Sequence, residues 1–228
     1  MLLLASTCAV APRWDLARGH LLRTGTVPAK DAGELLVQGK LVLAVPHVAT
    51  QAECAELVST CSSTAALIDD PISDPGLVRL PTAAAATRAI ADGTPCAAAM
   101  PTAANVLCEE IMRRALQTLD AELPSIGRLI FGEDHPASLY ARYAADELRF
   151  TKREPACNVY TAGGRFLPHK DYQALTCLVS LSPLSGFVGG GTGFWADDCQ
   201  GDPSLILRPP EGTALFFGGQ VCCCPAGW

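Results

Sequence analysis

The sequence has few charged residues and no cluster of basic ones. Charged residues make up 18% of its 228 residues, the net charge is −6, and Lys and Arg nowhere form a run. Proteins whose main partner is a nucleic acid or an anionic membrane surface carry a basic patch or stripe, so we expect neither partner here. A small molecule or a peptide is the expected partner.

Long apolar runs are also absent beyond the N-terminus. No later segment approaches the roughly 18 uninterrupted apolar residues of a membrane span, so none is predicted. The segment Met1–Ala11 is apolar and ends in Ala9-Val10-Ala11, which imitates a signal-peptidase site, but no Lys or Arg precedes it and Pro12 follows it. We interpret it as a weak signal segment. The compartment therefore stays open between the cytoplasm and, if the signal is real, the endoplasmic reticulum lumen.

The cysteines lack a regular pattern although they are numerous. Their number, eleven, is odd, and their spacing fits neither a paired CxxC zinc site nor the framework of a small secreted domain. Several lie within apolar patterns, so we interpret them as buried thiols that act as small hydrophobes. The run Cys222-Cys223-Cys224 is different, because three consecutive thiols on an extended strand cannot all face one metal ion.

Hydrophobic residues make up 49% of the chain, which is enough for one good-sized core. Residues 1–39 are interpreted as a lead-in, loosely structured from residue 12 because it carries mixed charge and several glycines. Residues 40–228 are interpreted as a single domain.

Local patterns predict a strand and two helices in the first half of this domain. The apolar run Leu41–Val45 predicts a buried strand. Thr50 and Glu53 have the spacing of a capping box, and a helix with one apolar face follows them. A second helix is predicted to begin with a cap at Thr102 and to end before Pro124. The segment Ser62 to Pro81 is interpreted as loop, and in the alanine-dense segment that follows it Gly93 and Pro95 interrupt any long helix.

After Ile126 the chain changes to short segments separated by Gly and Pro, with no further helical period. Strands are expected at Leu139–Tyr143, Cys157–Thr161, Arg165–Asp171, Leu175–Leu181, Phe194-Trp195, Ser204–Leu207 and Thr213–Phe217. Helices followed by many short strands predict an α+β fold, namely a jelly roll buttressed by N-terminal helices.

The triplet His169-Lys170-Asp171 is the centre of the chemistry. Two residues apart on a strand, the imidazole of His169 and the carboxylate of Asp171 point to the same face and can hold one metal ion. This pair suits Fe(II) or Mn(II) better than a structural zinc. A second histidine from a neighbouring strand would complete the facial triad of non-haem iron oxygenases.

The motifs around this triplet appear in a characteristic order. They are Asn158-Val159-Tyr160, the turn Gly163-Gly164, Phe166, His169-Lys170-Asp171, Gly189-Gly190-Gly191-Thr192-Gly193-Phe194 and Pro210-Glu211-Gly212-Thr213-Ala214-Leu215-Phe216-Phe217. In order and spacing they resemble the Fe(II)/2-oxoglutarate-dependent oxygenases, specifically the branch that looks like prolyl 4-hydroxylases. The layout is similar from Leu41 to Gly219, but the specific motifs occupy only residues 157–219.

The resemblance implies a double-stranded β-helix with iron at one mouth of the barrel. His169 and Asp171 would be two iron ligands, and Tyr160 and Thr176 would contact 2-oxoglutarate. The implied reaction uses O2 and 2-oxoglutarate to hydroxylate a peptidyl proline or a similar side chain, and it releases succinate and CO2. L-ascorbate is a further implied cofactor.

The sequence departs from the family pattern after Phe217. The second iron histidine and a later basic residue that would hold the far carboxylate of 2-oxoglutarate are not found, since His20, His47 and His135 all precede the triplet. The preferred explanation is a C-terminus that diverges near Cys222, which would leave the last strands missing, the sheet edge exposed and iron binding poor. The alternative is that a thiolate of the Cys222-Cys223-Cys224 run replaces the histidine.

Two other functions remain open on the sequence alone. One is a catalytically silent jelly roll that binds a peptide or protein partner at the former mouth of the barrel. The other is a metal-free cupin-like or lectin-like jelly roll, which ranks last because three Trp and four Tyr offer few stacking surfaces for sugars.

Overall fold

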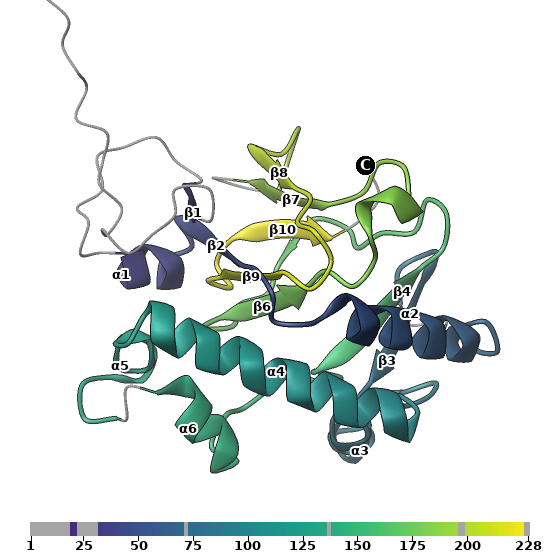
Figure 1. Cartoon of the computed structure of the whole chain (residues 1–228), viewed down its shortest axis with the longest axis horizontal. Helices are drawn as coiled ribbons and strands as arrows, with labels where there is room; N and C mark the ends of the chain where they lie inside the picture. The colour runs from purple at the N-terminus through teal and green to yellow at the C-terminus, as the bar shows by residue number, and fades with distance from the viewer. Residues whose placement is uncertain (1–18, 22–31, 71–72, 136–137, 196–198, 226–228) are drawn as a thin grey trace, which may run out of the picture.

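The computed structural model describes residues 19–21, 32–70, 73–135, 138–195 and 199–225 (Figure 1). In chain order the elements are β1 (Gly19–Leu21), α1 (Ala32–Val37), β2 (Leu41–Val45), α2 (Gln51–Ala65), β3 (Leu77–Pro81), α3 (Ala83–Ala91), α4 (Thr102–Glu122), α5 (Ile126–Phe131), α6 (Leu139–Ala144), β4 (Ala156–Tyr160), β5 (His169–Lys170), β6 (Thr176–Val179), the 3₁₀ turn η1 (Leu184–Gly186), β7 (Thr192–Trp195), β8 (Leu205–Leu207), β9 (Ala214–Phe217) and β10 (Cys222–Pro225). Helices combined with antiparallel sheets confirm the α+β class.

The predicted strand Leu41–Val45 and the capped helix after it are confirmed as β2 and α2. The backbone N–H of Thr50 donates to Glu53 Oε2 at 2.7 Å, and the N–H of Glu53 donates to Thr50 Oγ1 at 3.3 Å, which completes the capping box. The predicted second helix is α4, but the predicted cap at Thr102 is wrong. Thr102 is already helical, and Pro101 precedes it at the N-cap without a side-chain hydrogen bond.

Strands of the described chain form two four-stranded antiparallel sheets and one two-stranded ribbon. We call the sheet β1-β2-β9-β6 the helix-backed sheet and the sheet β5-β10-β7-β8 the site sheet, while β3 and β4 form the ribbon. In Figure 1 the helix-backed sheet lies between α4 and the site sheet. The molecule therefore has a helical layer and two sheet layers.

Two apolar clusters lie between these layers, and β9 contributes to both. Ala214 and Phe216 belong to the large cluster formed with the helices, whereas Leu215 and Phe217 belong to the cluster shared with the site sheet. Alternate residues of a strand point to opposite faces, so one strand joins both clusters. The predicted alternation over Leu175–Leu181 is confirmed in β6 in the same way: Cys177 packs on the helical side and Leu178 on the other.

The predicted strand Leu139–Tyr143 is wrong, since these residues begin helix α6. The hydroxyl of Ser138 accepts a hydrogen bond from the N–H of Ala141 and caps the helix. The carboxylate of Asp120, on α4, accepts from the N–H groups of Leu139 and Tyr140 at 2.8 and 2.9 Å. A carboxylate from another helix thus accepts hydrogen bonds from the backbone N–H groups of the first turn of α6, which have no partner within the helix. The absence of helices after Ile126 was likewise wrong, because α5 starts there.

Two segments interpreted as irregular contain regular structure. Strand β3 lies within Ser62 to Pro81 and pairs with β4 over its whole length. Helix α1 lies within the loosely structured lead-in, where Leu35 and Leu36 are buried in the large cluster. Both elements depend on partners distant in sequence.

The weak signal segment, Met1–Ala11, lies outside the described residues.

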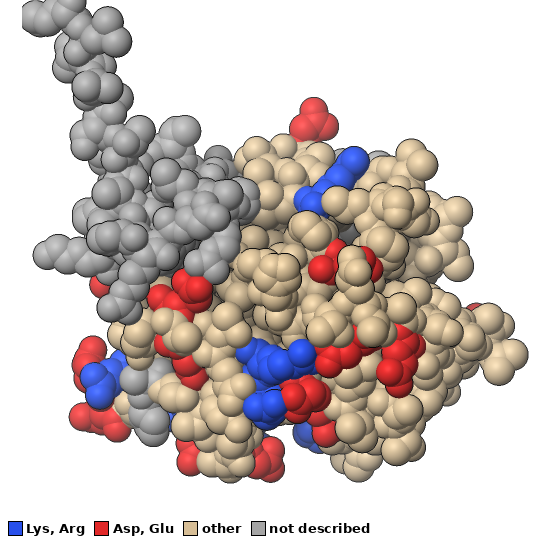
Figure 2. All heavy atoms as spheres, viewed as in Figure 1, with Lys and Arg blue, Asp and Glu red and all other residues tan. Residues whose placement is uncertain are grey.

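The helix-backed sheet and the site sheet face each other without closing into a barrel, so the jelly roll remains a prediction. Within the described ranges, no helix combines the length and the hydropathy that crossing a bilayer requires. Figure 2 shows Lys and Arg side chains next to Asp and Glu over the helical layer, in keeping with the mixed charge of the sequence.

Candidate metal centre

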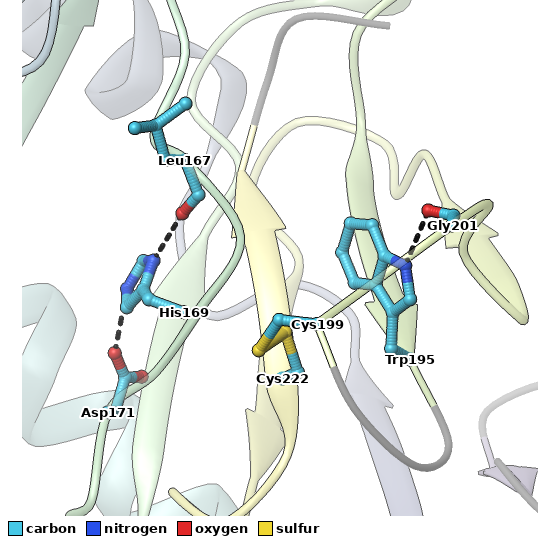
Figure 3. The surroundings of a disulfide bond; sticks show 7 residues. All are labelled: Leu167, His169, Asp171, Trp195, Cys199, Gly201 and Cys222. Atoms are coloured by element: carbon cyan, nitrogen blue, oxygen red, sulfur yellow. Dashed lines mark hydrogen bonds and ion pairs between the residues drawn. A yellow bond between two sulfur atoms is a disulfide. The ribbon is translucent and has the colours of Figure 1, made fainter.

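The structure brings His169 and Asp171 together at one end of β5. Nε2 of His169 lies 3.1 Å from Oδ1 of Asp171, and both side chains are partly open to solvent, with exposed fractions of 39% and 20%. The predicted arrangement on one face is therefore present. Figure 3 shows the two side chains in contact beside β10.

Neighbouring groups fix the orientation of both side chains. Nδ1 of His169 lies 2.7 Å from the carbonyl oxygen of Leu167, to which it donates, so Nε2 is the nitrogen directed at Asp171. The hydroxyl of Thr176, on β6, donates to Oδ2 of Asp171 at 2.6 Å. Each side chain thus keeps one atom for its neighbour or for an ion.

A close backbone contact holds the segment after Asp171 against the turn that leads into β10. The N–H of Tyr172 donates to the carbonyl of Gly219 at 2.8 Å, and the N–H of Gly219 donates to the carbonyl of Gln173 at 3.1 Å. A Cβ on Gly219 would lie 2.3 Å from that carbonyl oxygen, so only glycine fits there. This contact sets β10 beside β5.

Cys223 is brought to the same place by strand pairing. In the antiparallel register of β10 and β5, Cys223 is directly opposite His169, so the two side chains share one face. One ligand atom each from His169, Asp171 and Cys223 lies within 4.8 Å of the other two. Imidazole nitrogen, carboxylate oxygen and thiolate sulfur are all established metal ligands. The three residues form the candidate metal centre.

Cys222 faces the opposite side of β10. It forms a disulfide with Cys199, and Trp195 packs in the same small cluster, with its Nε1 donating to the carbonyl of Gly201 at 3.0 Å (Figure 3). Adjacent residues of a strand point to opposite faces. The prediction that the cysteines of this run cannot all face one metal is confirmed for Cys222 and Cys223.

The His169–Asp171 contact shifts the pKa of both residues. The hydrogen bond to Asp171 is the main reason that the pKa of His169 lies above its ordinary value of 6.5; burial opposes this shift and the carbonyl of Leu167 adds to it. Burial favours the neutral form of Asp171, but hydrogen bonds from His169 and Thr176 and the charge of Arg79 outweigh it and lower the pKa. Both shifts favour the imidazolium–carboxylate form of the pair.

The two residues expected to contact 2-oxoglutarate are both connected to this centre, Thr176 directly and Tyr160 through Phe166. Thr176 is bonded to Asp171, as described above. Tyr160 ends β4, and its ring lies edge-on to Phe166 at 6.3 Å, while Phe166 in turn lies 5.4 Å from the ring of His169. Their role towards a cosubstrate stays a prediction.

Local sequence spacing identified two members of the centre and missed two neighbours. Arg79, on β3, lies over the ring of Phe166 at 5.4 Å, and no local motif in the sequence points to it as a site residue. The spacing of the cysteines does not predict the disulfide between Cys199 and Cys222 either. Cys223 was considered only as one of three alternative thiols. The pairing of β10 with β5 would have singled it out, but nothing local in the sequence encodes that pairing.

Comparison with protein-family models and with curated proteins finds no match to this chain.

Proposed function

We propose that this protein is an Fe(II)- and 2-oxoglutarate-dependent oxygenase whose iron is held by His169, Asp171 and Cys223. The observation that carries the proposal is the convergence of three different donor atoms, from β5, the residue after it and β10, within 4.8 Å of one another. The motif order from Asn158 to Phe217 supplies the choice of reaction. The substrate is proposed to be a peptide or protein with a prolyl or similar side chain.

The donor set fits a single metal ion. Metal–nitrogen and metal–oxygen distances of about 2.0–2.2 Å and metal–sulfur distances of about 2.3 Å place the ligands of one ion roughly 3–4.5 Å apart. The 3.1 Å between Nε2 of His169 and Oδ1 of Asp171 lies within this range, and the separations to Sγ of Cys223 are at most 4.8 Å. Three protein ligands leave positions for a cosubstrate and O2, as in other non-haem iron oxygenases. When bound, iron and 2-oxoglutarate supply the oxidising chemistry.

The chain's own residues orient the ligands and limit access of water. The carbonyl of Leu167 keeps the proton of His169 on Nδ1 and so leaves Nε2 free to bind a metal. Thr176 holds Asp171 by one oxygen and leaves the other for the ion. Cys223 is 1% exposed, so its thiolate meets little water. These contacts pre-form the centre.

The double-stranded β-helix is part of the same proposal. The helix-backed sheet and the site sheet face each other across one apolar cluster, which includes Phe194 and Cys223 from one sheet and Leu215 and Phe217 from the other. A jelly roll also has two facing antiparallel sheets. We assign these sheets to its two halves.

Anaerobic metal titration tests the proposed centre. With Co(II) as a spectroscopic probe, the wild-type chain should bind one equivalent and show a thiolate-to-cobalt absorption band. Cys223→Ser should lose this band, and His169→Ala should weaken binding by more than the roughly 10–100-fold that loss of an outer hydrogen-bond partner costs. Thr176→Val should fall within that 10–100-fold range.

Cys177→Ser is the matched control, because Cys177 is a thiol of neighbouring strand β6 that packs on the far, helical side. It should bind Co(II) as the wild type does. Succinate release from 2-oxoglutarate by the Fe(II)-loaded chain then tests the reaction. A chain that binds no equivalent of metal, or a Cys223→Ser variant with an unchanged spectrum, would refute the assignment.

A catalytically silent binding module is the second candidate. It is favoured by one observation: His169 and Asp171 already satisfy each other at 3.1 Å, so their arrangement needs no ion. Such a module should bind its peptide equally well with and without metal, and His169→Ala should keep that binding. An oxygenase should lose turnover in the same variant while its fold is unchanged.

A further inference from the structure

The segment between β4 and β5 leads His169 into the candidate metal centre but belongs to no strand itself. Residues 161–168 form a turn and an irregular stretch. Pro168 has no backbone N–H with which to join a strand ladder. The imidazole nevertheless depends on this segment, because Nδ1 of His169 donates to the carbonyl of Leu167 at 2.7 Å (Figure 3). Contacts from outside the sheet must therefore hold that carbonyl in position.

Asp74 makes such a contact. Its Oδ2 accepts a hydrogen bond from the backbone N–H of Leu167 at 3.0 Å, although the two residues are 93 positions apart in the chain. A hydrogen bond to an ionised acceptor is stronger than one between neutral groups. The residue whose carbonyl orients His169 is thus itself held by a carboxylate.

The backbone that carries Asp74 is a tight turn directly before β3. The carbonyl of Asp74 accepts from the N–H of Leu77 at 3.1 Å, and Gly76 has a φ of +75°. Proline at the second position and a glycine with positive φ at the third are typical of a type II turn. Pro75 restricts φ at its own position, so the turn has little conformational freedom. We call residues 74–76 the clamp turn.

The clamp turn holds the same segment at a second point. The carbonyl of Gly76 accepts from the N–H of Thr161 at 2.9 Å. A Cβ on Gly164 would lie 2.0 Å from that carbonyl oxygen, so only glycine fits there. Contacts at Thr161 and at Leu167 therefore fix both ends of the stretch that precedes His169.

The charge of Asp74 has only a small direct effect on His169. The pKa of His169 is raised mainly by the hydrogen bond to Asp171, with a further contribution from the carbonyl of Leu167, and the charge of Asp74 contributes least. Asp74 therefore acts on the imidazole through the backbone of Leu167 more than through its charge.

We propose that Asp74 is a positioning residue of the candidate metal centre. It holds Leu167 so that the carbonyl of this residue keeps the proton of His169 on Nδ1 and directs Nε2 towards the ion. The role towards an ion rests on the proposed function, whereas the orientation of His169 does not. No local spacing in the sequence relates Asp74 to His169, because the clamp turn reaches the centre only through tertiary contacts.

Anaerobic titration with Co(II) tests this role. Asp74→Ala should weaken Co(II) binding by about tenfold, the lower end of the range for an outer partner, because it acts through one further residue. Asp74→Asn keeps an oxygen that can accept from Leu167, so it should rescue binding to within about threefold of the wild type. Wild-type affinity in Asp74→Ala would overturn the proposal. An equal loss in both variants would also overturn it, because the charge and not the hydrogen bond would then be responsible.

Asp120→Ala is the matched control. Asp120 is also a carboxylate that accepts from backbone N–H groups, those of Leu139 and Tyr140 at 2.8 and 2.9 Å, but it lies in the helical layer. This variant should lower the stability of the chain and leave Co(II) affinity unchanged, and circular dichroism checks that each variant is folded. A loss of affinity as large as that of Asp74→Ala would trace the effect to general destabilisation and overturn the proposal.

Failure of the metal centre gives a different result. If the wild-type chain binds no Co(II), the proposed function is refuted, and Asp74 is judged by NMR of the metal-free chain. At pH 5.5 the Nδ1 proton of His169, assigned by its absence in His169→Gln, should exchange with solvent roughly three- to tenfold faster in Asp74→Ala, as expected when a hydrogen bond is weakened. Equal exchange rates in the wild type and the variant would overturn the positioning role.

Discussion

The helix-backed sheet and the site sheet are stabilised in different ways. The first packs apolar side chains on both faces, against the helices on one side and the site sheet on the other. The second contributes Phe194 and Cys223 to one shared cluster, while on its other face the described residues form a small cluster around Trp195 and the disulfide of Cys222. A sheet that carries a partly open centre buries less apolar surface, and a covalent link offsets part of that loss.

Truncation of a core side chain should show the largest difference between the sheets. Phe216 is fully buried in the helix-backed sheet, and Phe216→Ala should lower the free energy of unfolding by about 3–5 kcal/mol. Ile206, on β8 of the site sheet, is 43% exposed, and Ile206→Ala should cost less than about 1 kcal/mol. Urea unfolding followed by circular dichroism measures both, and equal costs would contradict the comparison.

Removal of the disulfide should affect the site sheet first. Cys199 and Cys222 are 23 residues apart, and closing a loop of this length stabilises by about 3 kcal/mol in the chain-entropy account. Cys199→Ser should lower the free energy of unfolding by roughly that amount and speed amide exchange in β10 more than in β9. Dithiothreitol should destabilise the wild type similarly and leave the variant unaffected. A reductant-insensitive wild type would show that the link contributes nothing.

The helical layer depends in part on one local contact, which a pair of threonine variants can isolate. Thr50→Ala removes the capping box of α2 and should cost about 1 kcal/mol. Thr102 lies inside the first turn of α4 and caps nothing, so Thr102→Ala should change the free energy of unfolding by less than about 0.5 kcal/mol. Thermal or urea unfolding of the two variants side by side measures this difference, and a larger cost at Thr102 would contradict the observed N-cap.

The difference between local signals and long-range contacts explains which elements could be predicted from the sequence. Strand β2 and helix α2 were predicted correctly because their signals are local: an apolar run, then Thr50 and Glu53 at capping distance. Helix α6 was missed because Asp120 of α4 pairs its first N–H groups. Strand β3 was missed because its partner β4 lies far along the chain. Short segments take their structure from tertiary contacts that override local pattern.

The candidate metal centre divides in the same way. His169 and Asp171 were predicted to lie together because two-residue spacing on a strand places them on one face. Cys223 and Arg79 reach the same region only through strand pairing and packing, and no spacing rule relates them to His169. The link between Cys199 and Cys222 is one of many pairings that eleven cysteines allow, so sequence alone could not select it.

The smallest effect concerns pH and distinguishes the metal-free from the metal-bound centre. Without metal, the raised pKa of His169 means that its ion pair stabilises the folded chain fully below pH 6.5. This stabilisation is lost as the pH rises through the raised pKa. The lowered pKa of Asp171 means that the pair stabilises the folded chain fully above pH 3.8. This stabilisation is lost as the pH falls through the lowered pKa. The window of full effect therefore lies between these two ordinary values.

His169→Gln should accordingly destabilise the metal-free chain at pH 5.5 and much less at pH 8.5, by under about 1 kcal/mol because His169 is 39% exposed. The cost of Phe216→Ala, measured in parallel, should not depend on pH. With saturating Co(II) the pH dependence should reverse. A proton on Nε2 competes with the metal ion, so Co(II) should raise the free energy of unfolding of the wild type more at pH 8.5 than at pH 5.5. Urea unfolding of the wild type and of His169→Gln at the two pH values, with and without Co(II), measures the cost of the substitution under each of the four conditions. A metal-induced gain that is equal at both pH values would show that Nε2 of His169 is not a ligand, and the centre would then have to be drawn without it.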